Sequence, residues 1–229
     1  MKKNYRLFED AVSPVIGVLL MLVVTIIIAA VVSGFAGGLA GDTQKVPQAS
    51  IQVKTGYGTN YYGDAIDKNN FGIYFEHLSG DPLPTKDIEI ITYLTLPNGT
   101  VVTHKQNANS PFQNETTTGY TRVPFIRDQM LGNYYNTTAQ IDAGGSNPCW
   151  FGVYTLMPGQ VVRTYKKGVT AGFLGLVPES SLYPVNAADF AAGADLLEQC
   201  IQQGSQVDIK WLHKPSGKYI LDTKINLQG

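Results

Sequence analysis

The stretch "AVSPVIGVLLMLVVTIIIAAVV", residues 11–32, contains no charged side chain, and the run without charge continues to Asp42. As a helix, residues 14–39 would extend roughly 39 Å at 1.5 Å per residue, which is enough to cross a bilayer. Three basic residues precede the apolar run: Lys2, Lys3 and Arg6. By the positive-inside rule this basic end stays in the cytoplasm, and the chain beyond the apolar run is exported.

The start of this helix has its own sequence signal. Ser13 is a good N-cap, and Pro14 suits the first helical turn because proline lacks an amide hydrogen and has a helical φ. We therefore expect the helix to begin abruptly at Ser13–Pro14, directly after the charged residues.

Two ordinary interpretations of the apolar run compete. A secretory signal peptide has an apolar region of about 7–15 residues before a small-residue cleavage site. The "GLA" at 38–40 could be such a site, but the apolar run is too long for this class. A permanent signal anchor satisfies every physical criterion, and it predicts a membrane-anchored surface binding protein that does not polymerise.

A third interpretation comes from a family resemblance. The segment "EDAVSPVIGVLLMLVVTIIIAAVVSGFAGG", residues 9–38, resembles the N-terminal segment of archaeal type IV pilins, which carry a class III signal peptide. The resemblance implies cleavage by a prepilin peptidase after Asp10-Ala11, so that the mature chain begins at Val12. The fifth residue after this cut is Ile16, where bacterial pilins usually carry glutamate, so apolar packing must set the register between subunits.

The resemblance also implies partners and a function. Copies of the chain would pack through their N-terminal helices after the membrane stage, and the pilus assembly machinery would extract them. The product would be a cell-surface filament that serves adhesion or surface attachment. Small residues along the helix would let neighbouring helices approach closely. They are Gly17, Ala29, Ala30, Ser33 and Gly34.

The organisation that follows has three parts: a cleaved leader at 1–11, a hydrophobic transmembrane or filament-core helix at 12–42, and an extracellular β-rich head at 43–229. Seventeen Lys and Arg against 18 Asp and Glu give a formal net charge of −1. This balance argues against a general nucleic-acid binder, which usually carries a basic excess.

The head is predicted to be antiparallel and sandwich-like, so the whole chain falls in the α+β class. Alternating apolar and polar residues predict half-buried strands. They occur in 49–57, 70–80, 86–106 and 206–227. An Asn-Gly turn at 97–100 predicts a hairpin. The segments 74–90 and 210–227 share a strand, a histidine, a Ser-Gly turn and a returning strand, and we interpret both as hairpins.

One short helix is expected in the head. Asn186 can cap it, Phe190 and Leu197 fall on one face, and Gly204 can end it. Cys200 lies beside that face, and a disulfide to Cys149 would attach the helix to the β core. Such a bond would stabilise the head by roughly 4 kcal/mol in the chain-entropy model. Two buried free thiols are the alternative.

Three sequons are candidates for N-glycosylation, since each lies in polar, turn-like sequence beyond the membrane segment. They begin at Asn98, Asn114 and Asn136. The histidines are isolated, and no known catalytic or phosphate-binding motif is present. The acidic stretch at 62–70 lacks the spacing of an EF-hand loop, so a polar turn is expected there. The sequence therefore predicts no catalytic site, no metal and no cofactor.

Overall fold

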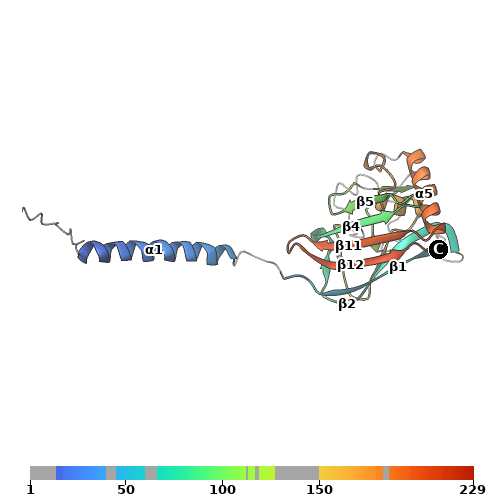
Figure 1. Cartoon of the computed structure of the whole chain (residues 1–229). Helices are drawn as coiled ribbons and strands as arrows, with labels where there is room; N and C mark the ends of the chain where they lie inside the picture. Colours follow the sequence, from blue (N-terminus) through green and yellow to red (C-terminus); the bar gives the residue numbers. More distant parts are fainter. Residues whose placement is uncertain are drawn as a thin grey trace, which may run out of the picture. The chain divides into compact units, whose positions relative to one another are not determined.

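The computed structural model describes residues 14–39, 45–59, 66–111, 113–116, 119–126, 150–182 and 186–229. Contacts divide the chain into two compact units, Met1–Gln44 and Lys45–Gly229. The first unit contains the helix α1 (Pro14–Leu39), and the second is the head (Figure 1). The sequence predicts this helix within residues 12–42 and the start of the head at residue 43, and these domain bounds stay a prediction.

The head is built mainly from two four-stranded antiparallel sheets, which confirms the predicted α+β class. The first sheet has the order β1 (Ala49–Thr59), β2 (Ile66–Gly80), β10 (Val161–Arg163) and β8 (Phe125–Ile126). The second has the order β12 (Lys218–Asn226), β11 (Gln206–His213), β4 (Ile88–Thr95) and β5 (Val101–Gln106). Figure 1 shows the four strands of the second sheet side by side.

Two short strand pairs add to these sheets within the described residues. They are β3 (Leu83–Pro84) with β9 (Thr155–Leu156), and β6 (Gln113–Thr116) with β7 (Gly119–Thr121). β3 leads directly into a 3₁₀ turn, η1 (Thr85–Asp87), which carries the chain into β4.

The core lies between the two sheets. Along β11, Val207, Ile209 and Trp211 are fully buried, as the alternating pattern predicts for one face of a strand. Trp211 meets Phe75 of β2, with ring centroids 5.1 Å apart, so the inner faces of the two sheets are in direct contact. The head is therefore a sandwich whose core is made by period-two strands from both layers.

The two sheets also approach each other at one edge. The Thr55 hydroxyl on β1 donates to the backbone oxygens of Asn226 and Gln228, at 3.3 and 3.1 Å. The Gln228 N–H in turn donates to the Thr55 hydroxyl oxygen at 3.2 Å. These contacts hold the end of β12 against β1.

Two predicted hairpins are confirmed and a third is wrong. β11 and β12 pair antiparallel around the turn at 214–217, as predicted for residues 210–227. β4 and β5 pair antiparallel around the Asn-Gly turn, with Leu94 opposite Val102. Residues 74–90 do not form a hairpin, because β2 pairs with β1 and β10 whereas β4 pairs with β11 and β5. At Gly80, with φ +114°, the chain leaves β2, and η1 then delivers it to the other sheet.

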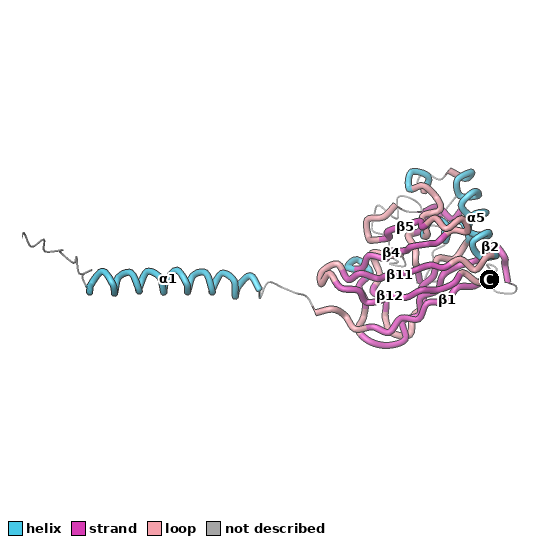
Figure 2. Tube along the Cα trace, in the orientation of Figure 1, coloured by secondary structure: helices cyan, strands magenta, loops and turns pink. Residues whose placement is uncertain are grey.

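In the described part of the head there are two α-helices and a second 3₁₀ turn. They are α4 (Lys167–Phe173), η2 (Glu179–Ser181) and α5 (Ala187–Gln202). α5 is the predicted helix, and the Asn186 side chain caps it by accepting from the Ala188 N–H at 3.1 Å. α4 packs against α5. In Figure 2 α5 lies at the edge of the head, with a further helical segment close to it.

A buried threonine pair fixes α4 to the first sheet. The Thr170 hydroxyl donates to the backbone oxygen of Phe71 at 2.9 Å and lies 2.6 Å from the Thr164 hydroxyl. The Ile73 N–H donates to the Thr164 hydroxyl oxygen at 3.0 Å. Both threonines are fully buried, so this network satisfies polar groups that water does not reach.

Candidate assembly site

α1 is apolar around its whole circumference. Within its own unit every side chain from residue 15 to residue 34 is exposed, and Met21 reaches 72%. Val15–Gly34 is long and apolar enough to cross a membrane by length and composition. A helix of this kind is stable only in lipid or packed against other apolar surfaces.

The Thr25 hydroxyl of α1 is compatible with such an environment. The Thr25 hydroxyl donates to the Leu22 backbone oxygen at 2.8 Å, which is three residues back in the same helix. Because this bond is internal, Thr25 brings no unsatisfied donor into hydrocarbon or into a packed helix bundle. No acidic residue lies in the first turn of α1 and no basic residue in its last turn.

Small residues interrupt the bulky surface of α1 at helical spacing. Ala30 and Gly34 are four residues apart, as are Ala29 and Ser33, so each pair shares a face. At Gly17 and Gly34 an added Cβ would meet no atom within 4 Å. These glycines are therefore not required by packing within the chain itself.

Most of the predicted leader boundary lies outside the described residues. This applies to Asp10, Ala11, Val12 and Ser13, whereas Pro14 is the first residue of α1. Cleavage between Ala11 and Val12 stays a prediction.

Of the three sequons, Asn98 is the one whose side chain the structure describes. It is exposed at the β4–β5 turn, and its Oδ1 accepts from the Thr100 N–H at 2.9 Å. This Asx-turn leaves the amide nitrogen directed away from the turn bond. Asn114 lies on β6 without a described side chain, and Asn136 is outside the described residues.

Cys200 on α5 is fully buried, and its thiol is free in the described part of the chain. Burial raises the pKa of this thiol, against a smaller opposing effect of a hydrogen bond with Ser205. Cys149 lies outside the described residues, so the predicted disulfide stays a prediction.

The histidines do not converge. His77 is buried on β2 and its Nε2 lies 3.1 Å from the Ser79 backbone oxygen. His213 is buried at the end of β11, with Nδ1 2.8 Å from the Ser216 hydroxyl. Among the described residues no cluster of three or more His, Cys, Asp or Glu could hold a metal ion.

A groove of about 330 Å³ lies between α4 and α5 and includes Phe190, Asp195 and Glu198 in its lining. Lys167 forms an ion pair with Glu198 across it. The hydrogen bond from Lys167 lowers the pKa of Glu198, so this carboxylate stays ionised near neutral pH. A carboxylate satisfied in this way is a structural ion pair and is poorly suited to act as a general acid.

The N-terminal segment is similar to a known protein family. Residues 10–51 match the family model described as "Archaeal Type IV pilin, N-terminal", which confirms the resemblance seen in the sequence. The matched region contains all of α1 and the first residues of β1. Pilins are structural subunits rather than enzymes.

The chain is also similar to an uncharacterized protein of Archaeoglobus fulgidus. The two are 33% identical over 87 residues, which covers 38% of this chain and 54% of the relative. The match thus spans about half the length of that relative, whose name states no activity.

Proposed function

We propose that this protein is the subunit of an archaeal type IV pilus-like surface filament. The observation that carries the proposal is α1, a 26-residue helix exposed on all described sides, in a segment that matches the pilin N-terminal family. Such a helix moves from one apolar environment, the bilayer, to another, a filament core made of the same helices.

Leader removal is the step that permits this transfer. Lys2, Lys3 and Arg6 hold the precursor with its N-terminus in the cytoplasm. The same charges would be costly inside an apolar helix bundle. Cleavage by a prepilin peptidase between Ala11 and Val12 therefore separates the membrane stage from assembly.

In the assembled filament the heads face outward, with the proposed N-glycans on their exposed asparagines. Adhesion or surface attachment is the proposed biological output, and it is supported by the pilin family match alone. Copies of the chain, the membrane, the prepilin peptidase and the assembly machinery are its proposed partners.

A pair of glycine substitutions tests assembly separately from membrane insertion. Gly17→Leu and Gly34→Leu keep α1 apolar, and a Cβ at either position meets no side chain or distant backbone of the chain within 4 Å. We expect both variants to reach the membrane fraction at normal levels. Electron microscopy of sheared cells should show at least about ten-fold fewer filaments. The reason is that each helix contact loses roughly 1.4 kcal/mol when the helices cannot approach closely, and this loss recurs at every subunit of the polymer.

Val24→Leu is the matched control, since it changes an already bulky position of the same helix. Normal filament yield from both glycine variants would contradict helix packing as the basis of assembly. Membrane insertion of the wild-type chain without any filaments would favour the alternative, a membrane-anchored binding protein.

A further inference from the structure

We propose that the end of the head at which the chain enters is a contact surface for anionic lipid headgroups. This surface, the base surface, consists of Lys45, Leu78, Lys86, Lys214, Lys218 and Tyr219. It acts while α1 holds the precursor in the bilayer, and in that respect it rests on the proposed function. The contact would hold the head against the membrane before extraction.

A series of backbone contacts brings these distant residues to one end of the head. The entering chain is fixed to the β2–β3 turn, because the Asp81 N–H donates to the Gln48 oxygen at 2.7 Å. That turn leads through β3 to Lys86 in η1. The next residue, Asp87, accepts from the Lys214 N–H at 2.9 Å.

Lys214 opens the turn that joins β11 to β12, and Lys218 closes it by pairing with His213. Figure 1 shows this turn and the start of β1 at the same end of the head, away from the marked C-terminus. Four lysines from three separate parts of the sequence therefore share one end.

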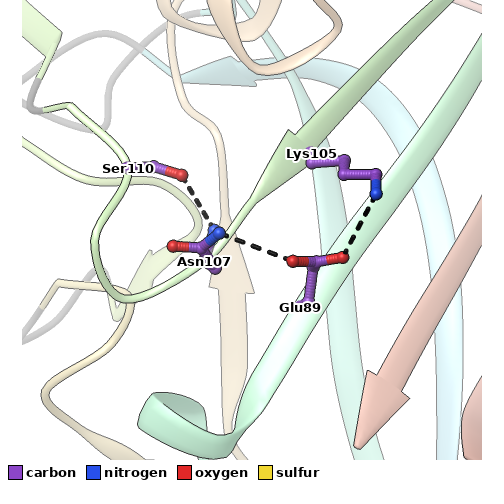
Figure 3. Close-up of polar contacts among 4 residues, drawn as sticks. All are labelled: Glu89, Lys105, Asn107 and Ser110. Carbon is purple, nitrogen blue, oxygen red and sulfur yellow. Dashed lines mark hydrogen bonds and ion pairs between the residues drawn. The ribbon is translucent and has the colours of Figure 1, made fainter. Parts of the chain in front are cut away.

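These lysines differ from most of the lysines on the faces of the sheets, although the exposed Lys68 of β2 also forms no ion pair among the described residues. Each of the sheet lysines 54, 105, 210 and 224 lies within 4.0 Å of a carboxylate. Figure 3 shows one example, in which Glu89 forms an ion pair with Lys105 and also accepts a hydrogen bond from the Asn107 side-chain amide. In contrast, Lys45, Lys86, Lys214 and Lys218 are exposed and form no ion pair within the described residues.

The excess of positive charge is local. The whole chain is nearly neutral, with 17 basic and 18 acidic residues. Two aspartates lie in the described segments that carry these lysines: Asp81, which accepts from the Gln48 N–H at 3.0 Å, and the half-buried Asp87. Four lysines against two aspartates leave this end positive.

The apolar members of the base surface also suit a lipid interface. Leu78 is 50% exposed and Tyr219 is 51% exposed, although large apolar side chains on the strands are mostly buried. Tyrosine is favoured at membrane interfaces because its ring is apolar and its hydroxyl is polar. Lysine stems can likewise lie on an apolar layer while the ammonium groups remain in water.

Chain length brings the base surface within reach of the bilayer. Residues 40–44 separate Leu39, the last residue of α1, from Lys45. Six residue steps span at most about 21 Å. An anionic membrane attracts a lysine only when the lysine lies within about a Debye length of its surface. A short link between α1 and the head is therefore needed for the base surface to be attracted.

The test uses the full chain in nanodiscs, compared between pure phosphatidylcholine and a mixture containing phosphatidylglycerol. Hydrogen exchange of the amides at 85–87 and 213–219 is the readout. We expect at least about two-fold slower exchange on the anionic discs, lost in 1 M salt, where the Debye length is about 3 Å. The variant K86Q/K214Q/K218Q should lose this protection, whereas K54Q/K105Q/K224Q should keep it.

Three other outcomes would each be decisive. Equal exchange on neutral and anionic discs, with α1 inserted, would overturn the base surface and leave the proposed function intact. Protection that appears only when two or more chains share a disc would also overturn it, because the partner would then be a second copy. Failure of α1 to enter the discs would count against the membrane stage and with it the inference.

Discussion

The indole ring of Trp211 on β11 and the phenyl ring of Phe75 on β2 lie 5.1 Å apart between centroids, at an interplanar angle of 46°. Both side chains are fully buried, and they belong to different sheets. Phe75 also meets Phe173 of α4, with centroids 6.2 Å apart. The pair therefore joins the two layers of the head and the covering helix at one point.

Truncating either ring should destabilise the head strongly. We expect Trp211→Ala or Phe75→Ala to lower the free energy of unfolding by about 3–5 kcal/mol, since each leaves a cavity between the sheets. The Trp211 Nε1 has no hydrogen-bond partner among the described residues. Trp211→Phe should therefore cost much less than Trp211→Ala in the same chemical denaturation, and equal losses would contradict this role of the ring.

The buried threonine network predicts a second stability effect. Thr170→Val keeps the side-chain volume but removes the donor to the Phe71 oxygen and the partner of Thr164. We expect a loss of about 1–3 kcal/mol, because buried polar groups are left unsatisfied. Thr103→Val, at an exposed position of β5, is the control and should stay within about 0.5 kcal/mol of wild type in urea denaturation.

The burial of His104 predicts how the stability of the head changes with pH. It lies on β5 against Gly175, and burial lowers the pKa of its imidazole from the ordinary value of 6.5. The unfolded chain then binds more protons than the folded one below about pH 6.5, so stability falls as the pH decreases through that value. His104→Gln should reduce the difference in unfolding free energy between pH 7.5 and lower pH, and an unchanged difference would exclude His104 as a source.

Asn98 is the sequon that we expect to be modified most completely. It is exposed at a hairpin turn, and its Oδ1 already accepts from the Thr100 N–H. Glycopeptide mass spectrometry of protein from its native cells should find a glycan at Asn98, and Asn98→Gln should remove that mass. An unmodified Asn98 beside a modified Asn114 or Asn136 would show that turn exposure does not select the site.

The elements predicted correctly have strong local signals. α1 follows from 26 residues without charge that begin at a proline, and β4–β5 follows from an Asn-Gly turn between alternating strands. α5 has both a cap at Asn186 and a single apolar face. In each case neighbours in the sequence decide the structure.

The wrong hairpin prediction for residues 74–90 shows what a local sequence pattern cannot determine. The alternating pattern identifies β2 and β4 as strands but carries no information about which strand each one pairs with. At Gly80 the backbone of Gln48 approaches so closely that an added Cβ would lie 2.1 Å from its oxygen. The entering chain thus occupies the space beside Gly80, and the backbone after β2 continues to the other sheet instead of folding back as a hairpin. α4 was missed for a related reason, since seven residues hold too few turns to show a helical period.

The base surface could not have been predicted from the sequence either. Its lysines lie at positions 45, 86, 214 and 218, each in an unremarkable polar context. They become neighbours only through the pairing of η1 with the β11–β12 turn and of the entering chain with the β2–β3 turn. The helix α1, in contrast, can be predicted because its whole signal is contained in one continuous segment.

The central claim is that this chain is a pilin-like subunit cut before its apolar helix, and the N-terminus of the native protein tests it most directly. Mass spectrometry of the N-terminal peptide from the sheared surface fraction should find a chain that begins at Val12. The formal net charge would then be −2, since the removed residues include three basic and two acidic side chains. A surface-exposed protein that still begins at Met1 would contradict the account.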